Sequence, residues 1–384
     1  MKKIAVVTAT RAEYGILTPL IKAINDDDEL ELELIVTGTH LSEKHGNTIK
    51  FIRNDGFPIA HELPILEDGN TPYDISVTMA NALLRTAECL RDDRPDMMVI
   101  LGDRTEMLGI AAAAMNERIP IAHLHGGEVT EGAVDDCVRH ALSKMSYLHF
   151  TSTEVYRRRV IQLGEAPERV FFVGALSTEN ILKAPLFSES EIRSEIGIPE
   201  NMPYSVVTFH PVTLEADSAR QQTLELCRAM EECSENYYLI TMANADAGGD
   251  MVNKLLGEFA DSHENVKLVS SLGMKRYLSA VKYCSFVLGN SSSGIIEAPV
   301  LGAPTVNIGD RQKGRLMADT IINCEPDSGS IAEAIHTAET AEHHSTLMYG
   351  DGSTSEKIIA VIKDVLMNDK VDLKKKFYDI KEQK

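Results

Sequence analysis

Short apolar runs alternate with amphipathic stretches along the whole chain. The amphipathic stretches, such as residues 75–90 and 104–116, predict helices that pack on a sheet. The apolar runs predict strands that are hydrophobic throughout, which is typical of parallel sheets covered by helices on both faces. The predicted strands are residues 4–9, 32–37, 58–63, 97–101, 120–124, 147–151 and 170–173, and then 204–209, 237–242, 266–269, 284–288 and 304–308.

The strands fall into two series, and the segment between them, residues 188–203, is acidic and carries two prolines. A chain of 384 residues also exceeds what one hydrophobic core usually supports. We therefore expect an α/β fold of two doubly wound domains, residues 1–178 and 179–367, that face a central cleft. Ligands of such sheets bind at the carboxyl ends of the strands.

Charge and composition limit the possible partners. The formal net charge is −20, and no long run of lysine and arginine occurs outside the short tail run 374–376, which argues against nucleic acid and against an anionic membrane surface. No apolar stretch approaches the roughly 18 residues of a membrane span. The apolar run at the N-terminus stops at Arg11 and Glu13, which favours a buried strand over a secretion signal.

The cysteines predict a cytoplasmic protein. They are scattered without a CxxC pair, and several stand in apolar runs, so we expect reduced thiols in the core. The six positions are Cys89, Cys137, Cys227, Cys233, Cys284 and Cys324.

A glycine and serine loop within residues 288–304, LGNSSSGIIEAPVLGAP, lies between a predicted buried strand and a helix predicted over residues 295–301. Backbone N–H groups and the positive end of the helix dipole would favour a phosphate there. Glu297 would be repelled by a phosphate, so it is expected to accept hydrogen bonds from sugar hydroxyls. The alternative is a serine-rich turn with an acid that complements the dipole. The loop residues are Ser291, Ser292, Ser293 and Gly294.

Polar residues follow several of the predicted strands, at residues 10–15, 102–104, 125–128, 210–211 and 290–291. One such group is often only a helix cap, but five of them predict side chains that converge on one cleft. Arginine and lysine are the residues suited to neutralise a diphosphate, although Arg276 could instead be a solvated helix residue. These candidate cations are Arg11, Arg276, Lys313 and Arg315.

Carboxylates form the other candidate group: Asp103, Glu128, Asp135 and Asp136. Several carboxylates in one cleft can push one pKa upward and so supply both an acid and a base. Asp136 and His140 are four residues apart and could share a helix face.

The sequence raises two cofactor alternatives, a metal ion and a nicotinamide. His123 and His125, with Glu128 and Asp135, could bind zinc or iron, but the chain lacks the barrel pattern in which such a motif normally occurs. A nicotinamide cofactor is disfavoured because no GxGxxG follows the first strand. We therefore expect neither a metal nor another cofactor.

Seven motifs resemble one family, in order and over nearly the whole chain. They are TATRAEYG from Thr8, VILGDRTE from Val99, HLHGGEVTEGAVDD from His123, VRHALSKMS from Val138, TFHPVT from Thr208, LGNSSSGIIEAP from Leu288 and NIGDRQKGR from Asn307. Together they resemble the hydrolysing UDP-N-acetylglucosamine 2-epimerases of nonulosonic (sialic-type) acid biosynthesis.

The resemblance implies two Rossmann-like domains in the glycosyltransferase-B arrangement, the second binding UDP, with the tail 368–384 packing back on the first domain. It implies a homo-oligomer that eliminates UDP from UDP-N-acetylglucosamine and hydrates the resulting 2-acetamidoglucal to N-acetylmannosamine, without NAD. Three alternatives stay open: the same reaction on UDP-N,N'-diacetylbacillosamine in a legionaminic acid pathway, a retaining glycosyltransferase of the same architecture, and a nucleotide-sugar binding module.

The resemblance also implies residue roles. Arg11, His210, Ser291, Ser292 and Arg315 would hold the diphosphate, and Glu297 the ribose. Asp103, Glu128 and Asp135 would handle protons and water at C1 and C2 of the sugar. Many members of the wider epimerase group have a glutamate in place of His125, so either His125 or Glu128 takes that acid/base role.

Overall fold

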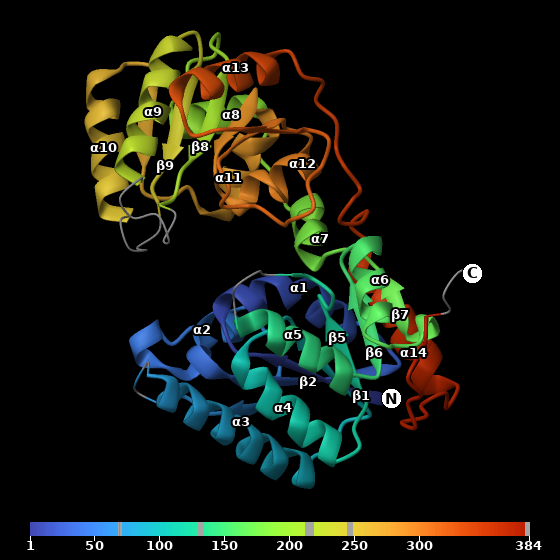
Figure 1. Ribbon diagram of the computed structural model, residues 1–384. Coiled ribbons are helices and arrows are strands. Elements are labelled where there is room, and N and C mark those ends of the chain that lie inside the picture. Colours follow the sequence, from blue (N-terminus) through green and yellow to red (C-terminus); the bar gives the residue numbers. More distant parts are fainter. Residues whose placement is uncertain (68, 70, 130–133, 212–218, 244–248, 381–384) are drawn as a thin grey trace. The chain divides into compact units, whose positions relative to one another are not determined.

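The computed structural model describes residues 1–67, 69, 71–129, 134–211, 219–243 and 249–380. The chain divides into two compact units, the first formed by Met1–Asn180 with Gly350–Lys384 and the second by Ile181–Tyr349. Each unit is a parallel sheet with helices on both faces, which confirms the predicted fold class (Figure 1). The segment that returns to the first unit begins at Gly350 rather than at residue 368, so the last helix belongs to that unit.

The first unit has a seven-stranded sheet in the order β3-β2-β1-β4-β5-β6-β7. Its strands are β1 Lys2–Thr8, β2 Leu30–Thr37, β3 Ile59–Leu63, β4 Met97–Leu101, β5 Ile121–Leu124, β6 Leu148–Thr151 and β7 Val170–Phe172. Its helices are α1 Arg11–Asn25, α2 Ile49–Asn54, α3 Pro72–Asp92, α4 Thr105–Asn116, α5 Val134–Met145, α6 Glu154–Gln162 and α14 Thr354–Met367, and α7 Leu176–Lys183 spans the division between the units.

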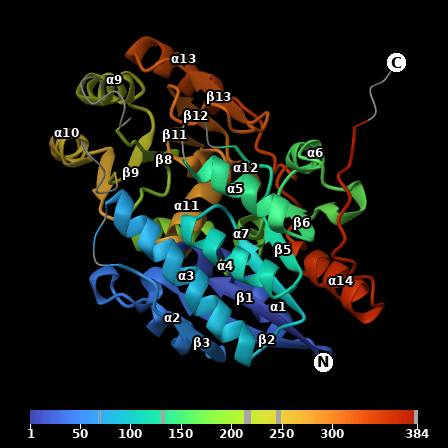
Figure 2. The ribbon, with the colours of Figure 1, turned by 60° about the horizontal axis from the view of Figure 1, so that its bottom comes forward.

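Alternate residues of the central strands enter two different cores. Ile4 and Val6 of β1 pack against α1 and α14 on one face of the sheet. Ala5 and Val7 pack on the other face, against α3 and α4, which lie side by side (Figure 2). Because successive side chains of a strand point to opposite faces, a strand buried on both faces must be apolar throughout.

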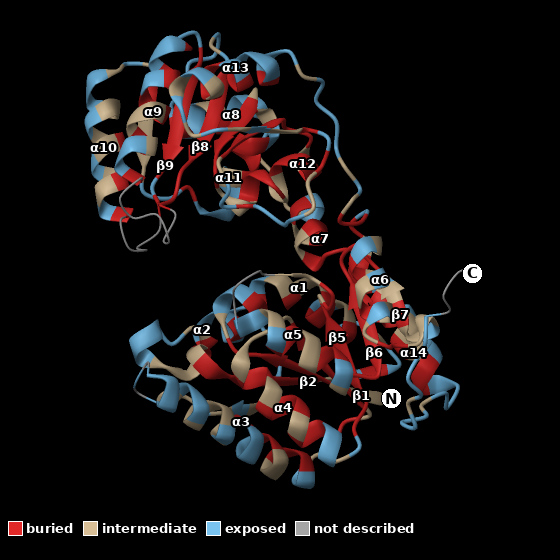
Figure 3. Cartoon of the chain, viewed as in Figure 1, coloured by how far each residue is buried: buried red, intermediate tan, exposed pale blue. Residues whose placement is uncertain are grey.

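The second unit has a six-stranded sheet in the order β10-β9-β8-β11-β12-β13, and its central strands are buried (Figure 3). The strands are β8 Tyr204–Thr208, β9 Tyr237–Thr241, β10 Val266–Val269, β11 Phe286–Gly289, β12 Thr305–Ile308 and β13 Ile321–Cys324. The helices are α8 Glu189–Ile196, α9 Ala219–Glu232, α10 Gly249–Ser262, α11 Gly273–Tyr283, α12 Glu297–Leu301 and α13 Ser328–Glu339.

Two expectations need correction. The edge strand β13 was not predicted, because its sequence IINC is only half-buried and lacks the continuous apolar run of the central strands. The cysteines are all free, but Cys137 is exposed on α5 and is not a core residue. Among the described residues, no helix is both long and apolar enough to span a membrane.

The C-terminal segment is held to the first unit by a buried carboxylate, Glu165. Lys375 Nζ and Lys144 Nζ each lie 2.6 Å from its oxygens, and His149 Nε2 lies 3.0 Å away. Burial alone would raise the pKa of Glu165, but the hydrogen bonds from His149, Lys144 and Lys375 outweigh burial and lower the pKa to about 2.

This ion cluster predicts an acid-dependent loss of stability. The folded-state pKa of Glu165 lies below the ordinary value of 4.5, so the cluster stabilises the protein above pH 4.5. That contribution, up to about 3 kcal/mol, is lost as the pH falls through 2. Urea unfolding at a series of pH values should therefore show a weaker acid dependence in Glu165→Gln than in the unmodified chain. The exposed neighbour Glu168 provides the control, since Glu168→Gln should keep the full dependence.

Candidate active site

In the first unit, three neighbouring strands end in loops that carry polar side chains. Asp103 follows β4, His125 follows β5 and Ser152 follows β6. The loop after β5 passes close to α6, where a Cβ on Gly127 (φ 81°) would lie 2.3 Å from the Tyr156 carbonyl oxygen. Only glycine fits that approach, and it directs the chain back so that Glu128 lies beside His125.

A buried arginine joins the candidate carboxylates. Arg139 of α5 is only 5% exposed and forms an ion pair with Asp103. Its Nη1 also donates to the backbone oxygen of Glu128 at 2.9 Å and lies 3.5 Å from Asp136 Oδ1. One guanidinium therefore fixes the loops after β4 and β5 relative to each other and to α5.

His125 and Glu128 form a pair. His125 Nδ1 lies 2.9 Å from Glu128 Oε1, and the Ser152 hydroxyl donates to the same oxygen at 2.8 Å. The backbone of His125 has φ 64°, a left-handed conformation that is costly for a residue with a Cβ. Its other ring nitrogen, Nε2, is buried and has no hydrogen-bond partner among the described residues. The ring is thus oriented through Nδ1, while Nε2 has no polar contact within that part of the chain.

His123 has a structural position instead. Its Nε2 lies 2.8 Å from the Gly102 carbonyl oxygen, and its Nδ1 lies 3.2 Å from Ser143 Oγ. Complete burial lowers the pKa of His123 to about 4, so the ring is neutral at physiological pH. Because both nitrogens are occupied, His123 offers no ligand atom to a metal shared with His125.

The other predicted residues of the first unit differ in their surroundings. Asp135 is exposed in the first turn of α5, and Asp136 contacts His140 at 3.4 Å, which confirms that those two share a helix face. Arg11 is exposed and stacks on the Phe51 ring, 4.6 Å from its centroid. Residues 130–133, which belong to the motif from His123, lie outside the described residues.

Glu13 is a buried acid that the sequence analysis did not select. Its Oε2 accepts a hydrogen bond from the backbone N–H of Ala9 at 3.1 Å. Burial raises the pKa of Glu13 to about 7, against the opposing charge of Arg104. Arg104 donates to Glu106 at 2.6 Å. Glu13 therefore titrates near neutrality at the carboxyl end of β1.

In the second unit, the serine loop forms a 3₁₀ turn that precedes a short helix. Ser291 caps the turn Ser292–Gly294, and α12 begins only at Glu297 and has five residues. The helix predicted from residue 295 is therefore wrong in its start and its length. Gly294 packs against Thr305 of β12. The Thr305 hydroxyl donates to the Gly294 carbonyl oxygen at 2.8 Å, so this oxygen is already hydrogen-bonded to the sheet.

The loops after β8 and β11 are clamped together by Asn290. Its side chain accepts from the backbone N–H of His210 at 2.7 Å and donates to the His210 carbonyl oxygen at 2.8 Å. Arg311 and Gln312 donate to the Asn290 backbone oxygen at 3.0 and 2.9 Å. These contacts fix His210 beside the serine loop.

Beside this clamp lies a cavity of about 450 Å³. Tyr277 donates to Ser293 Oγ at 2.7 Å on its wall. Burial raises the pKa of Glu297, although a hydrogen bond from Ser293 and the charge of Arg315 oppose the shift. Glu297 Oε2 is buried and has no hydrogen-bond partner among the residues that the structure describes. The residues that line the cavity are Thr208, His210, Thr241, Met242, Ser270, Ser271, Leu272, Gly273, Met274, Tyr277, Ser291 and Ser293.

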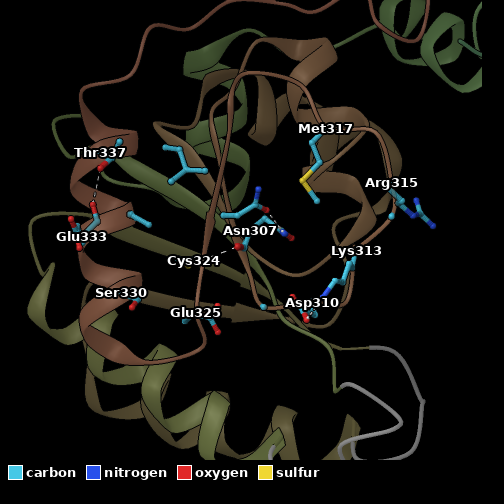
Figure 4. A pocket seen from close by; sticks show the side chains of 15 residues that line it. Asn307, Asp310, Lys313, Arg315, Met317, Cys324, Glu325, Ser330, Glu333 and Thr337 are labelled. Atoms are coloured by element: carbon cyan, nitrogen blue, oxygen red, sulfur yellow. Dashed lines mark hydrogen bonds and ion pairs between the residues drawn. The ribbon is translucent and has the colours of Figure 1, made fainter. Parts of the chain in front are cut away.

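The three candidate cations of the second unit do not line this cavity. Arg276 is half-exposed and pairs with Glu195 of α8. Lys313, which is 3.1 Å from Asp310, and Arg315 border a second cavity of about 710 Å³. Figure 4 shows both side chains on one wall of this second cavity, across from Glu333 and Thr337 of α13.

Two parallel α/β units, each with polar loops at the carboxyl ends of neighbouring strands, define a doubly wound α/β protein whose strand ends can bind a polar ligand. The UDP-N-acetylglucosamine 2-epimerase family matches residues 22–363. The chain therefore belongs to that family of UDP-sugar 2-epimerases, which confirms the resemblance found in the sequence.

Individual relatives agree with this assignment. The chain is 38% identical over 325 residues to the GDP/UDP-N,N'-diacetylbacillosamine 2-epimerase (hydrolyzing) of Campylobacter jejuni, covering 84% of each protein. It is 36% identical to the polysialic acid biosynthesis protein P7 of Escherichia coli, over all of this chain and 98% of that one. The crystal structure of Neisseria meningitidis UDP-GlcNAc 2-epimerase bound to UDP-GlcNAc shares the fold, with a TM-score of 0.76 at 17% identity over 95% and 100% of the chains.

Proposed function

We propose that this enzyme is a hydrolysing UDP-N-acetylglucosamine 2-epimerase that releases UDP and N-acetylmannosamine for sialic-type acid synthesis. The observation that carries the proposal is the set of acid/base groups in the first unit, where Arg139 holds Asp103 and where Glu128 orients His125. Binding of a nucleotide alone needs no such set. The polysialic acid biosynthesis relative, at 36% identity, supports this product class.

The reaction has two steps. In the first, the bond from C1 to oxygen breaks, UDP leaves with the electron pair, and the proton on C2 passes to a base, which gives 2-acetamidoglucal. No carbonyl adjoins C2 to stabilise a carbanion, so departure of UDP leads and positive charge develops at C1. In the second step water adds, with hydroxyl going to C1 and a proton to the opposite face of C2.

Each unit has a distinct task in this proposal. Asp103, Glu128 and Asp135 of the first unit, with His125, move the protons and direct the water. The second unit holds UDP, with His210 and the serine loop near the diphosphate and Glu297 on the ribose hydroxyls. The unpartnered, buried Oε2 of Glu297 supports that role, because a sugar hydroxyl would satisfy it. Arg11 and Arg315 add positive charge to the leaving diphosphate.

The sugar has a second candidate. The Campylobacter jejuni relative, at 38% identity, is a diacetylbacillosamine 2-epimerase, which favours UDP-N,N'-diacetylbacillosamine as an alternative substrate for the same two steps. The two sugars differ at C4 and C6, and side-by-side turnover of both would identify the substrate. Membership of the epimerase family favours proton chemistry over transfer to an acceptor. We further expect a homo-oligomeric, cytoplasmic enzyme, and no step above requires a metal or NAD.

Turnover in deuterated water tests the proposal. We expect UDP and a free 2-epimeric sugar with deuterium at C2, because the proton on C2 is lost and replaced from solvent. In water enriched in oxygen-18 the label should enter C1 of the sugar and be absent from UDP. A released sugar that retains its C2 hydrogen would exclude elimination, and label in UDP would place the cleavage at phosphorus.

A further inference from the structure

A second cluster of reactive side chains lies in the first unit, away from the loops described above. Glu33 of β2, His61 of β3 and Cys89 of α3 each offer a ligand atom, and these atoms lie within 4.8 Å of one another. Lys3 and Asp93 flank the cluster near the amino ends of β1 and β4. The proposed catalytic groups, by contrast, follow the carboxyl ends of β4 and β5.

An irregularity in strand pairing turns His61 toward Glu33. Leu34 pairs with Ile59, but the next residue, Ile35, pairs with His61, so Ala60 is passed over. Ile59 packs into the core beneath α1 and α14, whereas Leu63 packs on the face covered by α3 and α4. A regular strand would keep residues 59 and 61 on the same face. The bulge reverses this and directs the imidazole to the face that carries Glu33 and Cys89.

Glu33 is the least satisfied member of the cluster. It is 2% exposed, and both carboxylate oxygens are buried without a hydrogen-bond partner in the part of the chain that the structure describes. The nearest nitrogens stay at a distance, with His61 Nε2 3.5 Å from Oε1 and Lys3 Nζ 3.9 Å from Oε2. Lys3 donates its hydrogen bond to Asp93 instead. A buried carboxylate without a hydrogen bond is costly, and a bound cation would offset that cost.

The donor set selects the class of cation. Thiolate, imidazole and carboxylate together are the ligands of zinc-type ions, whereas magnesium and calcium prefer oxygen alone. A thiol that coordinates such an ion is deprotonated, so Cys89 would bind it as a thiolate.

We propose that Glu33, His61 and Cys89 bind one zinc-type divalent ion. Binding releases the thiol proton to solvent and forms the metal–sulfur bond, and water or Asp93 can complete a tetrahedral set. The ion joins β2, β3 and α3, which are otherwise held by packing and strand pairing. Its place at the opposite end of the strands from Asp103 predicts an effect on stability and none on turnover.

Cobalt(II) is a direct probe, because a cobalt–thiolate bond gives a charge-transfer absorption in the near ultraviolet. Titration of the full chain, first freed of metal by a chelator, should produce this band and saturate at a single ion per chain. Cys89→Ser should abolish the band, and Cys137→Ser, which removes an exposed thiol from α5, should leave it unchanged. No saturable band in the unmodified chain, or an equal band in Cys89→Ser, would overturn the proposal.

A second variant guards against misfolding of Cys89→Ser. His61 is partly exposed, so His61→Ala should fold. This variant should weaken cobalt binding by about a hundredfold or more, because losing a direct ligand should cost at least as much as losing a residue that only contacts a ligand. Zinc should raise the thermal midpoint of the unmodified chain and leave that of His61→Ala unchanged, while a chelator leaves UDP-sugar turnover intact. Equal cobalt affinity in His61→Ala would remove His61 from the site and overturn the proposal.

Discussion

Replacing Asp103 by asparagine is expected to lower UDP-sugar turnover by about a hundredfold or more, with little change in UDP affinity. Asparagine keeps the shape of the side chain but neither exchanges a proton nor carries the charge that faces Arg139. UDP affinity should persist because Asp103 is not among the proposed nucleotide contacts, most of which belong to the second unit. Steady-state kinetics would measure the first effect and calorimetric titration with UDP the second.

Two further variants separate a chemical role of Asp103 from a structural one. Asp136 also contacts Arg139, at 3.5 Å, so Asp136→Asn removes a carboxylate from the same arginine without removing Asp103. We expect a much smaller loss of turnover in that variant. Glu297→Ala should have the opposite effect to Asp103→Asn, because its main loss should be in UDP affinity, by about 1 to 3 kcal/mol, rather than in turnover. Equal losses in Asp103→Asn and Asp136→Asn would mean that Asp103 acts only by holding Arg139.

The central sheets could be predicted from the sequence because a strand buried on both faces leaves a continuous apolar run. The edge strand β13 could not, since only one of its sides is well covered. The serine loop shows a different limit. Its apolar residues 295–301 suggested one helix, but Pro299 lacks an N–H group and Gly294 is held against Thr305, so the chain forms a turn and a five-residue helix.

The site residues that directly follow strands were predictable, because parallel strands bring their carboxyl ends to one edge of the sheet. Arg139 was missed. It stands between the buried apolar positions Val138 and Leu142 of a helix, and a charged residue in such a position needs a partner of opposite charge. Arg276 was a candidate for the diphosphate, with a solvated helix residue as the alternative, and in the structure it pairs with Glu195, on a helix 81 residues earlier in the chain. Such pairings arise from tertiary contacts that local spacing does not encode.

The geometry around His125 bears on the question that the sequence left open, namely whether His125 or Glu128 is the acid/base. Glu128 Oε1 lies close to His125 Nδ1 and also accepts from Ser152, so this oxygen is engaged on both sides. The buried His125 Nε2, in contrast, lacks a partner within the described parts of the chain. This arrangement favours a joint role in which Glu128 orients the ring and stabilises its charged form, while Nε2 exchanges the proton.

A double-mutant cycle would reveal such a joint role. His125→Asn, chosen because asparagine tolerates the left-handed backbone at φ 64°, and Glu128→Gln should each lower kcat by about a hundredfold. If the two residues act as one unit, the double variant should lose little more than the worse single variant, because groups of one unit are not additive. Ser152→Ala removes one hydrogen bond from the same oxygen but leaves His125 and Glu128 in place, so it should lower kcat less than either of those single variants. Losses that multiply, to about ten-thousandfold in the double variant, would instead assign His125 and Glu128 to separate proton transfers.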